Sequence, residues 1–117
     1  MRQLSALVVD DDVNLRREIA RELRNFGYSV AMASDGSEAL TLCESEVFDL
    51  YIVDFSMPRM NGIDFYRDLR LPRSAKALKI ILFDKGEVRD DVVRLGVDAY
   101  FEKPLTVREF LGEVSKL

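Results

Sequence analysis

The sequence contains no histidine and only one cysteine, Cys43. Because histidine and cysteine are the usual ligands of zinc and other transition metals, their scarcity argues against such a site and leaves carboxylates as the candidate metal ligands. A single cysteine cannot form an internal disulfide. Its position among Ala39, Leu40 and Val47 predicts a buried thiol on a helix face.

Long apolar runs are also absent. No stretch approaches the roughly 20 apolar residues that a membrane-spanning helix needs, so we expect no membrane insertion. Residues 1–5 lead into a strand-like run without a long apolar stretch or a small-residue cleavage site. We therefore expect no signal peptide and a cytoplasmic location.

The chain has no block of positive charge. Its net charge is −4, and lysine and arginine are scattered along it, so we expect no direct binding to nucleic acid. The most basic segment, residues 16–24, carries four arginines with Glu18 and Glu22 among them. Charges of both signs at helical spacing predict a solvent-exposed helix face.

The length and composition predict one globular domain covering residues 1–117. The chain is 48% hydrophobic and 32% charged, which argues against disorder. Five short apolar runs predict strands at residues 6–9, 29–33, 50–53, 79–83 and 99–102.

Helical patterns follow each predicted strand. The first helix is predicted from apolar residues at near-helical spacing, ending with Phe26 before Gly27. The others are predicted to open at Asp35, to run from Gly62 to before Pro72, to span residues 88–95, and to begin at a Thr106 cap.

Alternating strands and helices predict a parallel sheet with helices on both faces. The first and third strands are rich in Val, Ile and Leu, as expected of central strands that are covered on both sides. The predicted class is therefore α/β: a flavodoxin-like, doubly wound (βα)5 domain with a five-stranded parallel sheet of order 2-1-3-4-5.

Three sequence segments place charged residues at predicted strand ends. Asp54 follows the third strand, the acidic run at residues 10–12 follows the first, and Lys103-Pro104 follows the last. Ligands of open α/β sheets bind at the carboxyl ends of the strands. We therefore expect these residues to converge on one crevice, with Asp12 starting the first helix instead of joining the site.

Clustered carboxylates repel one another unless a cation lies between them, and Mg²⁺ prefers oxygen ligands. Such a site suits phosphoryl transfer to a carboxylate. In that hypothesis Asp54 is the nucleophile, Asp11 binds the metal directly, and Asp10 binds it directly or through water. Lys103 pairs with the phosphoryl oxygens.

The segments Val8-Val9-Asp10-Asp11, Asp54-x-x-Met57-Pro58-x-x-Asn61-Gly62 and Lys103-Pro104 occur in one register. In this order and spacing, the chain resembles the receiver (CheY-like) domains of two-component response regulators over essentially its whole length. The resemblance implies a phosphoacceptor signalling domain in place of a turnover enzyme.

What the resemblance implies for the site is specific. A sensor histidine kinase or a histidine phosphotransfer protein would phosphorylate Asp54, with Mg²⁺ held by Asp10, Asp11, Asp54 and the backbone carbonyl of Ser56. Lys103 would pair with the phosphoryl group, and its peptide bond to Pro104 would be cis. An output domain, an effector protein and a homodimer mate are the further partners the family suggests, whether the chain is stand-alone or an N-terminal module.

The sequence departs from the family at the fourth strand. The family has Thr or Ser there, which works with an aromatic residue of the fifth strand as a switch. Here Asp84 takes the hydroxyl's place, Tyr100 is the aromatic residue, and no Ser or Thr occurs between Ser74 and Thr106. An ionised carboxylate cannot donate a hydrogen bond and repels a phosphoryl dianion.

Two alternatives follow. Asp84 favours a pseudo-receiver that signals through protein contacts without phosphorylation. A metal-dependent phosphohydrolase that resembles haloacid dehalogenases would also use an aspartyl nucleophile, but it requires a second acid two residues later, where this chain has Ser56.

Overall fold

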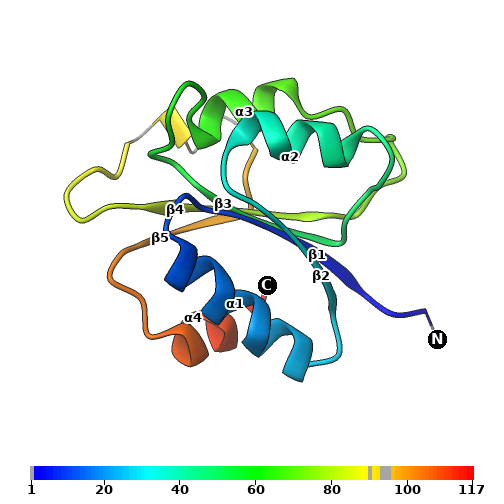
Figure 1. The fold of residues 1–117 in the computed structure, drawn as a ribbon, viewed down its shortest axis with the longest axis horizontal. Helices are drawn as coiled ribbons and strands as arrows, with labels where there is room; N and C mark the ends of the chain where they lie inside the picture. Colours follow the sequence, from blue (N-terminus) through cyan, green and yellow to red (C-terminus); the bar gives the residue numbers. More distant parts are fainter. Residues whose placement is uncertain (1, 90, 93–95) are drawn as a thin grey trace.

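A computed structural model of the chain describes residues 2–89, 91–92 and 96–117 (Figure 1). The described residues form one five-stranded sheet whose paired strands are all parallel, in the order β2-β1-β3-β4-β5. The strands are β1 (Ser5–Val9), β2 (Ser29–Ala33), β3 (Leu50–Asp54), β4 (Leu78–Phe83) and β5 (Ala99–Glu102). The predicted fold class and strand order are confirmed.

Four helices in the described ranges cover the two faces of the sheet. They are α1 (Val13–Asn25), α2 (Gly36–Cys43), α3 (Gly62–Asp68) and α4 (Val107–Val114). Figure 1 shows α1 and α4 together on one face and α2 and α3 on the other. None of these helices is long and apolar enough to cross a bilayer.

The core lies in two layers, one on each side of the sheet. Alternate residues of a strand point to opposite faces. Accordingly Ala6 and Val8 of β1 pack beneath α1 and α4, whereas Leu7 and Val9 pack beneath α2 and α3. Every residue of β3 is buried. The prediction that the first and third strands are central is therefore confirmed.

Several local predictions need correction. Phe26 does not belong to the buried face of α1: it is the C-cap, with 65% of its surface exposed, because the chain turns at Gly27 with φ +94°. The Thr106 side chain makes no capping hydrogen bond to the described part of α4. The Cys43 thiol is half-buried, and burial together with Glu46 raises its pKa to about 11, as expected of an inert thiol.

The helix predicted at residues 88–95 falls partly on residues 90 and 93–95, which lie outside the described residues. Asp91 and Val92 form a short 3₁₀ turn. Val92 is fully buried in a third apolar cluster with Phe55 and Phe83. This cluster anchors the segment between β4 and β5 beside the end of β3.

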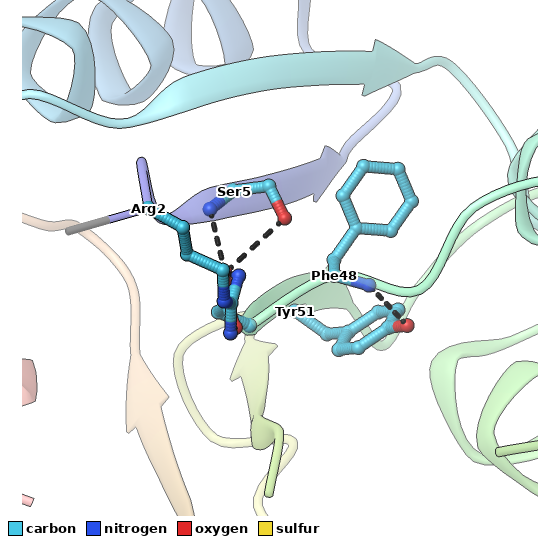
Figure 2. A network of polar contacts seen from close by, with 5 residues as sticks. Arg2, Ser5, Phe48 and Tyr51 are labelled. Atoms are coloured by element: carbon cyan, nitrogen blue, oxygen red, sulfur yellow. Dashed lines mark hydrogen bonds and ion pairs between the residues drawn. The ribbon is translucent and has the colours of Figure 1, made fainter. Parts of the chain in front are cut away.

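A polar network holds the amino-terminal edge of the sheet. Asp49, directly before β3, accepts two hydrogen bonds from the Arg2 guanidinium, at 2.6 and 2.9 Å, and one from the Ser5 backbone N–H at 2.8 Å. Figure 2 shows Arg2 and Ser5 converging beside β1, and the Phe48 N–H bonded to the Tyr51 hydroxyl, 3.0 Å away. These contacts fix the start of β3 at the edge opposite the predicted site.

Candidate functional site

The carboxyl edge of the sheet brings the predicted acidic residues together. β1 and β3 are neighbours, with Val9 beside Val53, so Asp10 and Asp54 leave the sheet side by side. Carboxylate oxygens of Asp10, Asp11 and Asp54 all lie within 4.8 Å of one another. Asp10 and Asp54 are almost fully buried, whereas Asp11 is exposed. The acidic group is therefore buried at Asp10 and Asp54 and accessible to solvent at Asp11.

The turn from β1 into α1 fixes the first carboxylate. The backbone N–H of Asp12 donates to Asp10 Oδ1 at 2.9 Å. The Asp12 side chain in turn accepts from the backbone N–H groups of Asn14 and Leu15, so Asp12 is the N-cap of α1, as predicted. Sequence reasoning missed Arg16, whose Nη1 donates to the Asp10 backbone carbonyl at 2.7 Å.

Lys103 reaches the same group from the end of β5. Its Nζ lies 3.0 Å from Asp10 Oδ2 and 3.4 Å from Asp54 Oδ1. The Lys103 backbone N–H donates to the Phe83 carbonyl at 2.7 Å, and the Lys103–Pro104 peptide bond is cis. The lysine is thus held over the two buried carboxylates by its own main chain.

One lysine does not satisfy these carboxylates. Asp10 Oδ2 and Asp54 Oδ1 are buried and have no hydrogen-bond partner among the described residues, because their contacts with Lys103 are ion-pair contacts without hydrogen-bond geometry. Buried polar atoms without partners are rare and usually mark a missing ion or a functional role. These two oxygens without hydrogen-bond partners, together with the Asp11 carboxylate, form a set of oxygen ligands of the kind that Mg²⁺ prefers.

The electrostatics of the group favour an added cation. Burial and the nearby Asp10 charge raise the pKa of Asp54 from 3.8 to about 7, despite Lys103. Burial also raises the pKa of Asp10, against the opposing effects of the Asp12 N–H and of Lys103. For Lys103, burial lowers the pKa, but Asp10 and Asp54 together raise it above its ordinary value.

The loop between β3 and α3 packs tightly against the end of β3. A Cβ atom on Gly62 would lie 2.8 Å from the Asp54 carbonyl oxygen, so only glycine fits there. The Asn61 side chain accepts from the Asp64 N–H and begins α3. Ser56 is exposed, two residues after Asp54.

Among the described residues, Asp84 and Tyr100 make no bond to this group. Asp84 follows β4 and is half-buried, and no hydrogen bond or ion pair joins its side chain to the described acidic group. Tyr100 lies on β5 with 43% of its surface exposed, and its ring packs edge-on against Phe83 with centroids 5.9 Å apart. The Phe83 ring also packs in a tilted arrangement against the ring of Phe55, which follows Asp54, with centroids 4.9 Å apart.

A five-stranded parallel sheet with clustered carboxylates and a lysine at its carboxyl edge is the architecture of a signalling receiver. The family model described as the response regulator receiver domain matches residues 6–115, and the chain belongs to this family.

Relatives of two lengths match the chain. Chemotaxis protein CheY of Pseudomonas aeruginosa is 33% identical, with 97% of this chain and 95% of that protein covered. Response regulator ArlR of Staphylococcus epidermidis is 36% identical over 92% of this chain but only 49% of its own length. The chain thus spans nearly all of one relative and about half of the other.

Solved structures agree with this assignment. A CheY-like receiver domain protein of Methanospirillum hungatei has a TM-score of 0.86 at 27% identity, with 98% of this chain and 93% of that chain covered. Response regulator protein TrrA of Thermotoga maritima, solved in complex with Mg²⁺-BeF, has a TM-score of 0.81 at 32% identity, with 97% of each chain covered.

Proposed function

We propose that the chain is a working phosphoacceptor: a sensor histidine kinase or a histidine phosphotransfer protein phosphorylates Asp54 in a Mg²⁺-dependent reaction. The observation that carries this proposal is the pair of buried carboxylate oxygens, on Asp10 and Asp54, that have no hydrogen-bond partner in the described part of the chain and flank Lys103. A structural ion pair would have had its oxygens satisfied by the protein.

The proposed step is an in-line phosphoryl transfer. A carboxylate oxygen of Asp54 forms a bond to phosphorus while the bond from phosphorus to the donor's histidine nitrogen breaks, and the electron pair of that bond stays on the nitrogen. Lys103 is placed to pair with the phosphoryl oxygens as the group arrives. Asp54 must be ionised to attack, so its raised pKa has to be countered.

Asp10, Asp11, Asp54 and the backbone carbonyl of Ser56 are the residues that would hold Mg²⁺. When bound, the ion would neutralise the clustered carboxylates and the phosphoryl oxygens and so favour the ionised form of Asp54. The similarity to TrrA, whose structure contains Mg²⁺-BeF, supports this part of the proposal.

The relatives support a role in two-component signalling with a kinase as the input partner. Because CheY is matched over nearly its whole length and ArlR over half, a stand-alone regulator and a module joined to an output domain both fit. In either arrangement residues 1–117 would act as one receiver domain.

The test is intact mass after incubation with acetyl phosphate, a small phosphoryl donor that needs no kinase. The proposal expects a gain of one phosphoryl group that requires Mg²⁺ and is absent from Asp54→Asn. An unchanged mass, under conditions that phosphorylate an ordinary receiver, would contradict it.

A second candidate is the pseudo-receiver, which Asp84 favours. This carboxylate follows β4, where the family has a hydroxyl. No Ser or Thr occurs between Ser74 and Thr106 that could supply the hydroxyl instead. In this alternative the domain keeps its fold and binds a protein partner constitutively. The same mass measurement separates the two candidates, because only the first predicts a phosphoryl group.

A further inference from the structure

Arg16 connects α1 to the backbone of the acidic site. It lies at the end of the first turn of the helix and is half-buried, and its Nη1 donates to the Asp10 carbonyl oxygen at 2.7 Å. Its neighbour Arg17 is exposed, and its side chain makes no hydrogen bond or ion pair with another described residue. The two adjacent arginines therefore have different structural environments.

Each polar group of Asp10 except one is already bound. Its N–H donates to the Ala33 carbonyl, its Oδ1 accepts from the Asp12 N–H, and its carbonyl accepts from Arg16. Only Oδ2 has no hydrogen bond from the residues that the structure describes, and it lies next to Lys103. The surrounding bonds thus set the direction in which this one free oxygen points.

We infer that Arg16 is a positioning residue, which orients Asp10 for the cation through the Asp10 carbonyl and holds the β1–α1 turn in its binding geometry. This inference rests on the proposed function, since it concerns the same metal site. Partners that orient a ligand commonly change metal affinity roughly tenfold to a hundredfold when removed. In this inference Arg16 acts through the Asp10 carbonyl and is not itself a ligand of the ion.

The experiment compares Arg16→Met with Arg17→Met in the whole chain. Calorimetric titration with Mg²⁺ measures affinity, and hydrogen exchange of the Asp12 amide in metal-free protein measures the order of the turn. We expect Arg16→Met to bind Mg²⁺ roughly tenfold more weakly and to exchange the Asp12 amide faster. Arg17→Met should match the wild type in both, and Arg16→Lys, which keeps a donor, should recover part of the affinity.

Equal Mg²⁺ affinity and equal Asp12 exchange in Arg16→Met and the wild type would overturn the inference. If Arg16→Met does not fold, Arg16→Gln carries the same comparison with the same expected and contradicting results. A wild type without Mg²⁺ affinity would instead reject the proposed function. The Asp12 exchange rate would still decide whether Arg16 orders the turn.

Discussion

The strand β3 has an aspartate at each end, and the two carboxylates have opposite environments. Asp49, before the strand, accepts hydrogen bonds from Arg2 and Ser5. Asp54, the last residue of the strand, is more deeply buried and has an oxygen with no hydrogen-bond partner among the described residues. The same side chain is thus satisfied at one edge of the sheet and left open at the other.

The pKa values follow this difference. The bond from Arg2, helped by Ser5, lowers the pKa of Asp49, so the fold stabilises its charged form. Burial and the nearby Asp10 charge raise the pKa of Asp54 to about 7, so the fold disfavours the charged form of Asp54. This difference indicates that Asp49 contributes to stability, whereas the unsatisfied Asp54 is the aspartate to which the proposed function assigns chemistry.

The largest expected effect comes from exchanging each carboxylate for an amide. Asp54→Asn should lose phosphorylation by acetyl phosphate completely, because a neutral amide cannot supply the anionic nucleophile that the proposed function assigns to Asp54. Asp49→Asn should be phosphorylated at close to the wild-type rate, since it lies at the other edge of the sheet. Intact mass against time measures both rates. An equal loss of phosphorylation in the two variants would show that the two aspartates do not differ in their role.

The next largest effect is expected in the pH dependence of the unfolding free energy, to which Asp54 should contribute. Because the folded-state pKa of Asp54 is raised, its contribution to stability is fully present below about pH 4 and is lost as the pH rises through about 7. The loss is on the order of a few kcal/mol. Urea unfolding of metal-free protein should therefore show Asp54→Asn gaining stability over the wild type across this window.

Added Mg²⁺ should reduce that gain at neutral pH, because a ligand of the folded state stabilises it. If Asp54→Asn and the wild type kept the same difference in unfolding free energy from pH 4 to pH 8, the raised pKa of Asp54 would be wrong.

At the other edge, Asp49→Ala should cost about 1–3 kcal/mol of unfolding free energy, because it leaves the Ser5 N–H without its acceptor. Arg2→Gln is the matched control. Its side chain is 72% exposed, so its removal should cost less than that of Asp49. Urea unfolding of both variants checks this order, and the reverse order would show that the exposed ion pair is the main stabilising contact.

The smallest expected effect concerns Asp84. Replacing it with Thr removes a negative charge beside the carboxyl edge and supplies a hydroxyl donor, so phosphorylation by acetyl phosphate should become a few-fold faster. Asp84→Asn separates the two causes, because it removes the charge without adding the hydroxyl. Slower phosphorylation in both variants would mean that Asp84 assists the reaction.

Patterns local to the sequence predicted most of the fold. The apolar runs located all five strands to within one residue at each end, because strands of a parallel sheet that helices cover are short and rich in apolar residues. Asp12 was predicted as a cap because such capping uses only neighbouring residues. The acidic group required one further step, the rule that ligands bind at the carboxyl ends of parallel strands.

Contacts between distant residues were not predictable in this way. Asp49 gives no local indication of its role, because Arg2 and Ser5 lie more than 40 residues away. Arg16 was assigned to a solvent-exposed face since charge patterns do not show that its guanidinium turns back to Asp10. The spacing of Phe26 fits the apolar series of the first helix, but the helix ends one residue earlier, and local spacing does not show that the Phe26 ring is exposed.

The most direct test of this account is to locate the phosphoryl group after reaction with acetyl phosphate and Mg²⁺. Borohydride reduces an aspartyl phosphate to homoserine, which peptide mass mapping assigns to one position. The account predicts homoserine at position 54 and none at positions 10, 11 or 49. Homoserine at any of those three positions would contradict the account. The complete absence of homoserine from a protein that binds Mg²⁺ would contradict it as well.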